Sequence, residues 1–205
     1  MAEPNVTELV DFGKRAVDVA IGRGAEEAEA FLSMSSSTSI DIERGQIVRS
    51  IKRMDQGLGV RAVYRKAVGF SYVNTLTDKN VEEAAARAFR AARASRLDKN
   101  WRNLPSPRRF GETEGTYDKR IVAVSSDELV ETAAVMLGAV EAYDKRVLSV
   151  AGGVGASVFH TVVVNSHGVE AFDRGTAVGC SMETIARDGA DVTPACYELN
   201  AERVY

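Results

Sequence analysis

The 205-residue sequence predicts an α+β fold in which long helices pack against antiparallel sheets. Two observations lead to this class. Apolar residues recur with a helical period in three segments, 5–24, 77–95 and 125–146. Between and after these segments, polar and apolar residues alternate as they do in strands. Because both halves run from a helix into antiparallel strands, we expect two similar helix-plus-strands halves.

The first helix is expected over residues 5–24, and Gly22 and Gly24 are both candidates for its C-terminal stop. The period then changes, because Ile40 and Ile42 fall on one face of a strand while Asp41 and Glu43 fall on the other. The letters "ERGQ", residues 43–46, predict the turn of a hairpin. The apolar stripe of the helix consists of Val6, Leu9, Val10, Val17, Ala20 and Ile21.

The stretch "GLGVRA", residues 57–62, matches the glycine fingerprint of a dinucleotide-binding turn. That motif needs a helix whose N-terminal amides hold the pyrophosphate. Here alternating residues continue a strand to Tyr64, and "RKA" breaks it before the next strand. We therefore interpret Gly57 and Gly59 as a bulge or a close approach of two backbones within a hairpin.

The two later helices have clear starts. Thr77 is placed to cap an alanine-rich helix, whose small residues indicate close packing against a sheet. Ser125 and Glu128 have the spacing of a capping box at the start of the other helix. The expected inward residues are Val81, Ala84, Ala85, Ala88, Phe89 and Ala92 in the first, and Val130, Ala133, Ala134, Leu137 and Val140 in the second.

The chain is expected to divide into four parts. Residues 1–96 hold the first helix, strands and the alanine-rich helix, and 97–120 form a polar connector. Residues 121–190 hold the second half, in which 146–189 are interpreted as three strands with a turn at "NSHG". Residues 191–205 are expected to start a link to a further C-terminal domain, with a helix beginning at Asn200. A disordered natural tail is the alternative for this last part.

The side chains do not indicate a catalytic or metal site. His160 and His167 stand at an odd separation, which sends side chains to opposite faces of a strand. Catalytic zinc normally takes three protein ligands. Cys180 is interpreted as a structural thiol, and carboxylates such as Glu27 as solvated. We therefore predict no catalytic residue, no metal ligand and no cofactor in this chain.

Composition and net charge limit the partners and the cellular compartment that the sequence predicts. The net charge of −3 argues against a protein that coats nucleic acid or membranes. No apolar run spans a bilayer, no signal peptide is evident and two cysteines suit a reducing compartment, so we expect a cytoplasmic protein. The connector is either a weak nucleic-acid site or a solvated linker that Trp101 anchors to a helix, and the acidic total favours the linker. Its basic and aromatic residues are Arg96, Lys99, Trp101, Arg102, Arg108, Arg109 and Phe110.

The order of these motifs resembles the TldD/PmbA family. In that family a strand with an acidic-glycine turn leads to G-x-G-V-R, then a G-F strand and an alanine-rich helix, as in residues 40–93 here. Residues 162–189 look like the family's NS-x-G turn and the strand after it. The likeness runs from about Glu26 to Asp188. Residues 117–133 and the Asn165–Ser166 turn look more like the PmbA (TldE) side.

The resemblance implies a cytoplasmic proteolytic system in which a TldD-type and a PmbA-type subunit associate. Its zinc belongs to a histidine-glutamate motif in the C-terminal half of the TldD-type subunit. No residue here matches that motif, so no catalytic role is transferred to this chain. The family is also described as a modulator of DNA gyrase, which names a cellular effect and implies no DNA-binding site.

We therefore expect the N-terminal domain of a metallopeptidase system that serves peptide recognition and contact with a TldD-type subunit or a second copy. Four residues are candidates for binding the peptide backbone or a carboxylate: Arg61, Asn165, Ser166 and Gly168. The ordinary interpretation of these residues is a packed strand arginine and a turn. The alternative function is a non-enzymatic regulatory module that contacts a protein, gyrase or nucleic acid through the connector.

The missing ligand set makes a direct prediction. The purified chain should retain less than one equivalent of zinc after dialysis and should not digest casein, because too few nitrogen and sulfur donors are present to hold a catalytic ion. Metal analysis and a protease assay on the same sample test this. An equimolar metal that survives dialysis together with proteolysis would overturn it.

Overall fold

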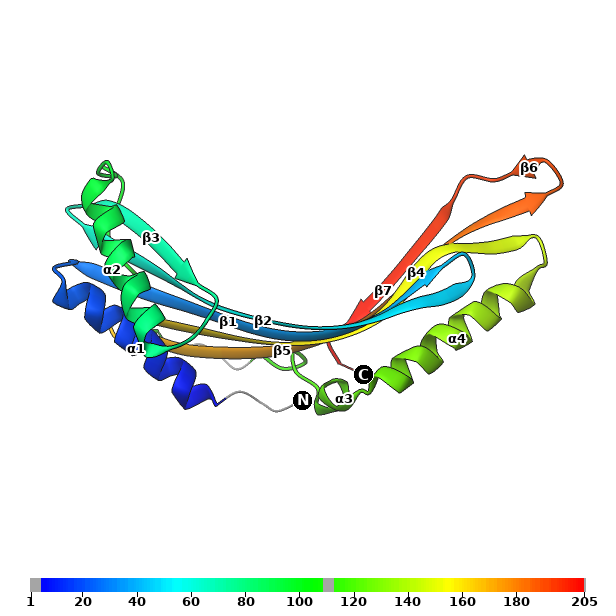
Figure 1. Cartoon of the computed structure of the whole chain (residues 1–205), viewed down its shortest axis with the longest axis horizontal. Coiled ribbons are helices and arrows are strands. Elements are labelled where there is room, and N and C mark those ends of the chain that lie inside the picture. The colour runs from blue at the N-terminus through cyan, green and yellow to red at the C-terminus, as the bar shows by residue number, and fades with distance from the viewer. Residues whose placement is uncertain (1–4, 109–112, 205) are drawn as a thin grey trace.

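A trough-shaped antiparallel sheet organises the chain (Figure 1). The computed structural model describes residues 5–108 and 113–204. It contains seven strands in the order β3-β2-β1-β4-β5-β6, and β7 also pairs with β5. Every strand pair is antiparallel. The α+β class with antiparallel strands is therefore confirmed.

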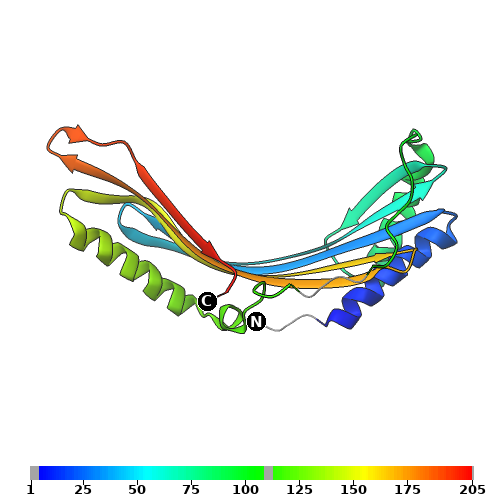
Figure 2. The ribbon, with the colours of Figure 1, turned by 180° about the vertical axis from the view of Figure 1, so that it is seen from behind.

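The elements follow the chain in a simple order. The helices are α1 (Val6–Gly22), α2 (Asp78–Ala94), α3 (Lys119–Ala123) and α4 (Ser126–Tyr143). The strands are β1 (Glu27–Glu43), β2 (Gln46–Tyr64), β3 (Ala67–Val73), β4 (Val147–Asn165), β5 (Glu170–Asp188), β6 (Asp191–Val192) and β7 (Cys196–Glu202). Helices α1 and α2 lie at one end of the trough and α3 and α4 toward the other, all on its outer side (Figures 1 and 2).

The alternation of β1 decides which face the helices cover. Even-numbered residues near its two ends are buried: Leu32 lies in the cluster under α1 and α2, and Ile40 and Ile42 lie in the cluster under α4. Residues 34–38 between them are only half-buried. The odd-numbered residues point to the concave side, where none of the described helices lies (Figure 2). We call this concave side the open face.

The predicted turns and caps are observed. Arg44 and Gly45 turn β1 into β2 with φ of 50° and 75°, and Arg65 and Lys66 turn β2 into β3. The Thr77 side chain accepts a hydrogen bond from the Asn80 amide at the start of α2. The capping box of Ser125 and Glu128 is present at the start of α4.

The helical stripes are confirmed for α2 and corrected for the others. All six residues expected to face inward in α2 are buried. In α4, Leu129 is buried and Ala134 is exposed, so the buried face is rotated from the expected one. Ile21 of α1 is exposed, whereas Gly13 and Ala16, which the expected stripe did not include, are buried. Gly22 is the last residue of α1, and Gly24 beyond it has the left-handed φ of +106°.

The glycine-rich stretch is strand, as expected. Residues 57–62 lie within β2, and a Cβ on Gly59 would come within 2.9 Å of the Phe70 ring on β3. The glycine therefore makes room for a side-chain ring, whereas the sequence pattern predicted a bulge or a second backbone there. The approach at Gly69 is tighter, because helix α2 passes directly over it.

Two expectations about strands were wrong. Residues 146–189 form two strands of 19 residues each instead of three shorter ones. Asn200 lies inside β7, where it pairs with Cys180 of β5, and does not cap a helix. Pairing with the edge of β5 supplies hydrogen-bond partners along seven residues, whereas a single isolated helical turn is unstable.

The contact of α2 with β3 makes a stability prediction. A Cβ on Gly69 would lie 2.1 Å from the Ala92 amide nitrogen and 2.2 Å from the Ala88 carbonyl oxygen, both backbone atoms. Gly69→Ala should therefore lower the free energy of unfolding by at least about 2 kcal/mol. The control is Gly138→Ala in α4, where a Cβ meets nothing within 4 Å and should stabilise by about 0.5–1 kcal/mol. Equal denaturation curves for the two variants would contradict the packing described.

Candidate functional site

The sheet brings the four predicted site residues to one end of the trough. Glu29 of β1 pairs in register with Arg61 of β2 on one side and with Asn165 of β4 on the other. Directly paired residues share a face of a sheet. Arg61, Glu29 and Asn165 therefore form a row on the open face, and Ser166 and Gly168 follow in the turn.

Arg61 is held by two neighbours. Its Nη2 atom forms an ion pair with Oε1 of Glu29, whose side chain is only 14% exposed. The guanidinium carbon lies 5.8 Å from the centroid of the Trp101 ring, within the range of a cation–π contact. The buried Nε has no hydrogen-bond partner among the described residues. The side chain is 39% exposed, so part of the guanidinium faces the open side.

The polar groups of the turn are occupied within the chain. Oδ1 of Asn165 accepts hydrogen bonds from the amides of His167 (3.0 Å) and Val169 (3.1 Å). Its Nδ2 donates to the Pro105 carbonyl at 2.8 Å. Oγ of Ser166 accepts from the Ala28 amide at 3.1 Å, and Gly168 adopts φ of +89°. These contacts shape the turn and hold the connector beside it.

Glu27 is the residue that sequence reasoning missed. The sequence indicated a solvated carboxylate, yet the Glu27 side chain is only 14% exposed. It accepts two hydrogen bonds and lies within ion-pair distance of a histidine. Trp101 donates its Nε1–H to Oε1 at 3.0 Å, the Leu104 amide donates to Oε2, and Nε2 of His167 lies 3.5 Å from Oε2. The only local signal was its place on the same strand face as Glu29. Its partners lie more than 70 residues away in the chain.

The connector is thus fastened to strands. Trp101 anchors it to Glu27 of β1, not to a helix as expected. Farther along, the Thr116 carbonyl accepts from the Thr176 amide, and the Asp118 amide donates to Oγ1 of buried Thr176. Arg96, Lys99, Arg102 and Arg108 are exposed, and Arg109 and Phe110 lie outside the described residues.

Three exposed aromatic residues border Arg61 on the open face. Phe70 pairs with Arg61, and Tyr72 and Phe31 both pair with Gly59 from opposite sides. Phe31, Phe70 and Tyr72 are 48%, 62% and 72% exposed. We call these three residues the aromatic patch. Contiguous apolar exposure of this kind marks interaction surfaces.

The remaining metal-binding residue types are dispersed. His160 is buried and stacks on Phe172 with ring centroids 6.0 Å apart, whereas His167 faces Glu27. Cys180 is half-buried beside α4 and Cys196 is exposed. Across residues 5–108 and 113–204, no group of three His, Cys, Asp or Glu side chains could hold a metal ion.

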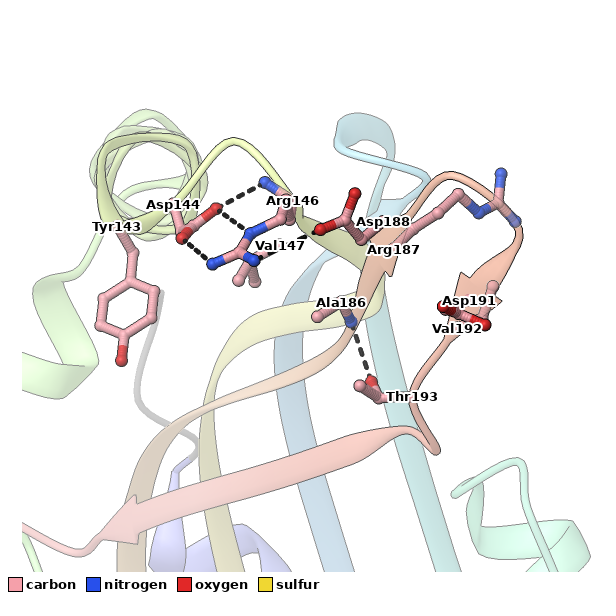
Figure 3. Close-up of a pocket in the computed structure, with 10 residues that line it drawn as sticks. All are labelled: Tyr143, Asp144, Arg146, Val147, Ala186, Arg187, Asp188, Asp191, Val192 and Thr193. Carbon is pink, nitrogen blue, oxygen red and sulfur yellow. Dashed lines mark hydrogen bonds and ion pairs between the residues drawn. The ribbon is translucent and has the colours of Figure 1, made fainter.

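A hollow of about 460 Å³ lies at the opposite end of the trough (Figure 3). Arg146 bridges Asp144 at the end of α4 and Asp188 at the end of β5. Hydrogen bonds from the side chain and backbone amide of Arg146 lower the pKa of Asp144 to about 2. These ion pairs join the end of α4 to the β5–β6 hairpin at a solvent-exposed surface. We therefore interpret the hollow as a structural contact between these elements.

The described helices are also not suited to cross a membrane. None of them combines the length and the apolar character that crossing a bilayer requires.

The curved antiparallel sheet with helices on its outer side defines an α+β class of domain. Two sequence models match: PmbA/TldA metallopeptidase domain 1 over residues 28–92, and the central domain of the same family over residues 119–199. The chain belongs to the PmbA/TldA (TldD/PmbA) family. A curated relative, an uncharacterized protein of Methanocaldococcus jannaschii, is 26% identical over 80% of this chain and 36% of its own length.

Solved structures share the fold. TldE from Thermococcus kodakarensis superposes with a TM-score of 0.84 and 26% identity, over 97% of this chain and 43% of that one. A protein of Bacteroides thetaiotaomicron named "putative modulator of DNA gyrase" gives a TM-score of 0.84 at 22% identity, over 95% of this chain and 45% of that one. The chain thus spans less than half the length of these relatives.

The role of Glu27 can be tested by substitution. Glu27→Ala should lower the free energy of unfolding by about 1–3 kcal/mol, because the Trp101 indole and the Leu104 amide lose their acceptor. It should also speed proteolytic cleavage within residues 97–108. Glu27→Gln is the matched control, because its remaining carbonyl oxygen preserves one acceptor and most of the protection. A Glu27→Ala protein with unchanged Trp101 fluorescence, stability and cleavage would refute this role.

Proposed function

We propose that this chain is the part of a PmbA/TldD-type peptidase assembly that recognises peptide and contacts a second subunit, without performing hydrolysis. Membership of a metallopeptidase family supports the setting. The observation that carries the role is the open face, which is bordered by exposed aromatic residues while the helices lie on the other side. A face of this kind is suited to contact with another polypeptide.

The aromatic patch is the proposed subunit contact. Burying phenylalanine and tyrosine rings removes a large apolar area from water, and such residues dominate the binding energy of protein interfaces. The curvature of the sheet lets a convex partner surface reach the patch from the open side (Figure 1). The partner is a TldD-type subunit or a second copy of this chain, and the likeness to a TldE structure favours the TldD-type subunit.

Arg61 is the residue through which this face would engage a peptide. Its guanidinium is positioned by Glu29 and Trp101 and keeps partial exposure beside Phe70. A bound carboxylate would add a charge-assisted hydrogen bond there. Asn165, Ser166 and Gly168 would act indirectly, since their hydrogen bonds and backbone geometry hold the turn and the connector next to that site.

The zinc implied for the family does not fit the donors present here. The two histidines of the chain have separate neighbours, and one of them is buried under an aromatic ring. We therefore assign no step of peptide hydrolysis to this chain and place that chemistry with the TldD-type subunit.

The aromatic patch can be tested by binding. Phe31→Ala combined with Tyr72→Ala should weaken association with a TldD-type subunit at least tenfold in isothermal titration, because two interface rings are removed. The control is Tyr143→Ala on α4, which removes an even more exposed ring (83%) away from the open face. Equal affinity of the patch variant and the wild-type chain would rule out the aromatic patch as the contact.

A further inference from the structure

Strand β2 has a long edge without a neighbour. It pairs with β1 from Gln46 to Val63, but β3 pairs with it only from Leu58 onward. Among the described residues, no strand pairs with the other side of residues 46–57, which we call the free edge. Figure 1 shows β3 at the end of the trough near α2, away from the β1–β2 hairpin.

Most of the free edge is also exposed, although Ile47 near its start packs against the cluster under α4. Residues 48–50 and 52–56 are exposed, including Val48 (49%) and Met54 (73%). In the rest of β2, the even-numbered residues Leu58, Val60 and Ala62 are buried under helices. A bare strand edge presents alternating N–H and C=O groups that another extended chain can pair with. At about 3.4 Å per residue, the free edge can accommodate a peptide of roughly ten residues.

The charge of the free edge indicates what would pair with it. It carries Arg49, Lys52 and Arg53 against a single acidic residue, Asp55. Arg49 already pairs with Asp41 of β1 at 2.7 Å, while Lys52 and Arg53 are exposed on opposite faces of the strand. Two such edges side by side would bring basic side chains together, so another copy of the same edge is disfavoured. An acidic strand would be complementary.

We propose that the free edge binds an extended acidic polypeptide as an added β-strand. Main-chain hydrogen bonds provide the attachment and tolerate varied side chains, while Lys52 and Arg53 select for acidic residues. This inference deepens the proposed role in peptide recognition by naming a second place and a class of peptide. It is independent of the subunit contact, because the free edge and the aromatic patch involve different residues and can be altered separately.

The experiment uses the 205-residue chain and three synthetic probes. The first is a fluorescein-labelled ten-residue peptide of alternating Thr and Glu, which favours an extended conformation. The second replaces every Glu with Lys. The third keeps the Thr-Glu sequence but is N-methylated at its six central amides, so that its central residues cannot donate hydrogen bonds from either edge. Fluorescence anisotropy measures the affinity of each probe.

The Thr-Glu peptide should bind, and its affinity should fall with added salt. The Lys peptide and the N-methylated peptide should each bind at least tenfold more weakly. Lys52→Glu combined with Arg53→Glu should weaken binding of the Thr-Glu peptide about tenfold. The matched control is Lys79→Glu with Arg90→Glu on α2, which makes the same change in charge at exposed positions and should bind like the wild-type chain.

Three results would overturn the proposal. One is equal affinity for the N-methylated peptide, which would exclude strand pairing. Another is unchanged binding by the Lys52/Arg53 variant when circular dichroism shows it folded. The third is a dimer in sedimentation that dissociates in this variant, which would make a second copy the occupant. Failure of the TldD-type subunit to bind would leave all three peptide measurements unaffected, so the two proposals fail separately.

Discussion

Strand β1 is the constraint on which the rest of the structure depends. It pairs with β2 from Glu27 to Glu43 on one side, and with β4 from Glu29 to Glu43 on the other. Strand β4 lies beyond the connector, so this pairing joins segments far apart in the sequence into one sheet. The region matched by the first family domain and the region matched by the central domain thus share a continuous hydrogen-bonded ladder.

The alternation of β1 then gives the two faces different uses. Its buried positions are small near α1 and α2, where Ala28 and Ala30 let the helices approach, and larger near α4, where Ile40 and Ile42 fill the second cluster. The opposite face carries Glu27 and Glu29, which hold the connector and Arg61. One strand therefore both seats the helices and organises the candidate site.

Local features of this fold could be predicted because they depend on neighbours in the sequence. Thr77, the capping box at Ser125 and the turn at Gly45 each act over a few residues. The membership of the family could also be inferred, since it rests on the order of such motifs.

The remainder depends on partners that the local sequence does not specify. The strand at Asn200 exists because the edge of β5 is available, and the function of Glu27 appears only when Trp101 and Leu104 reach it. Similarly, the side-chain chemistry of Arg61 and Asn165 makes them candidates, whereas their meeting beside Glu29 follows from the register of three strands. The burial of the Glu27 carboxylate by a connector more than 70 residues away leaves no periodic pattern in the local sequence.

Through β1 and β4, the two family-domain regions form one cooperative sheet. Native-state hydrogen exchange in increasing denaturant tests it most directly, because it reports the free energy of opening at each amide. We expect the amides of β1 and β4 to share one opening free energy and one denaturant dependence. Opening of β4 and β5 at distinctly lower free energy, with the amides of β1 and β2 still protected, would contradict it.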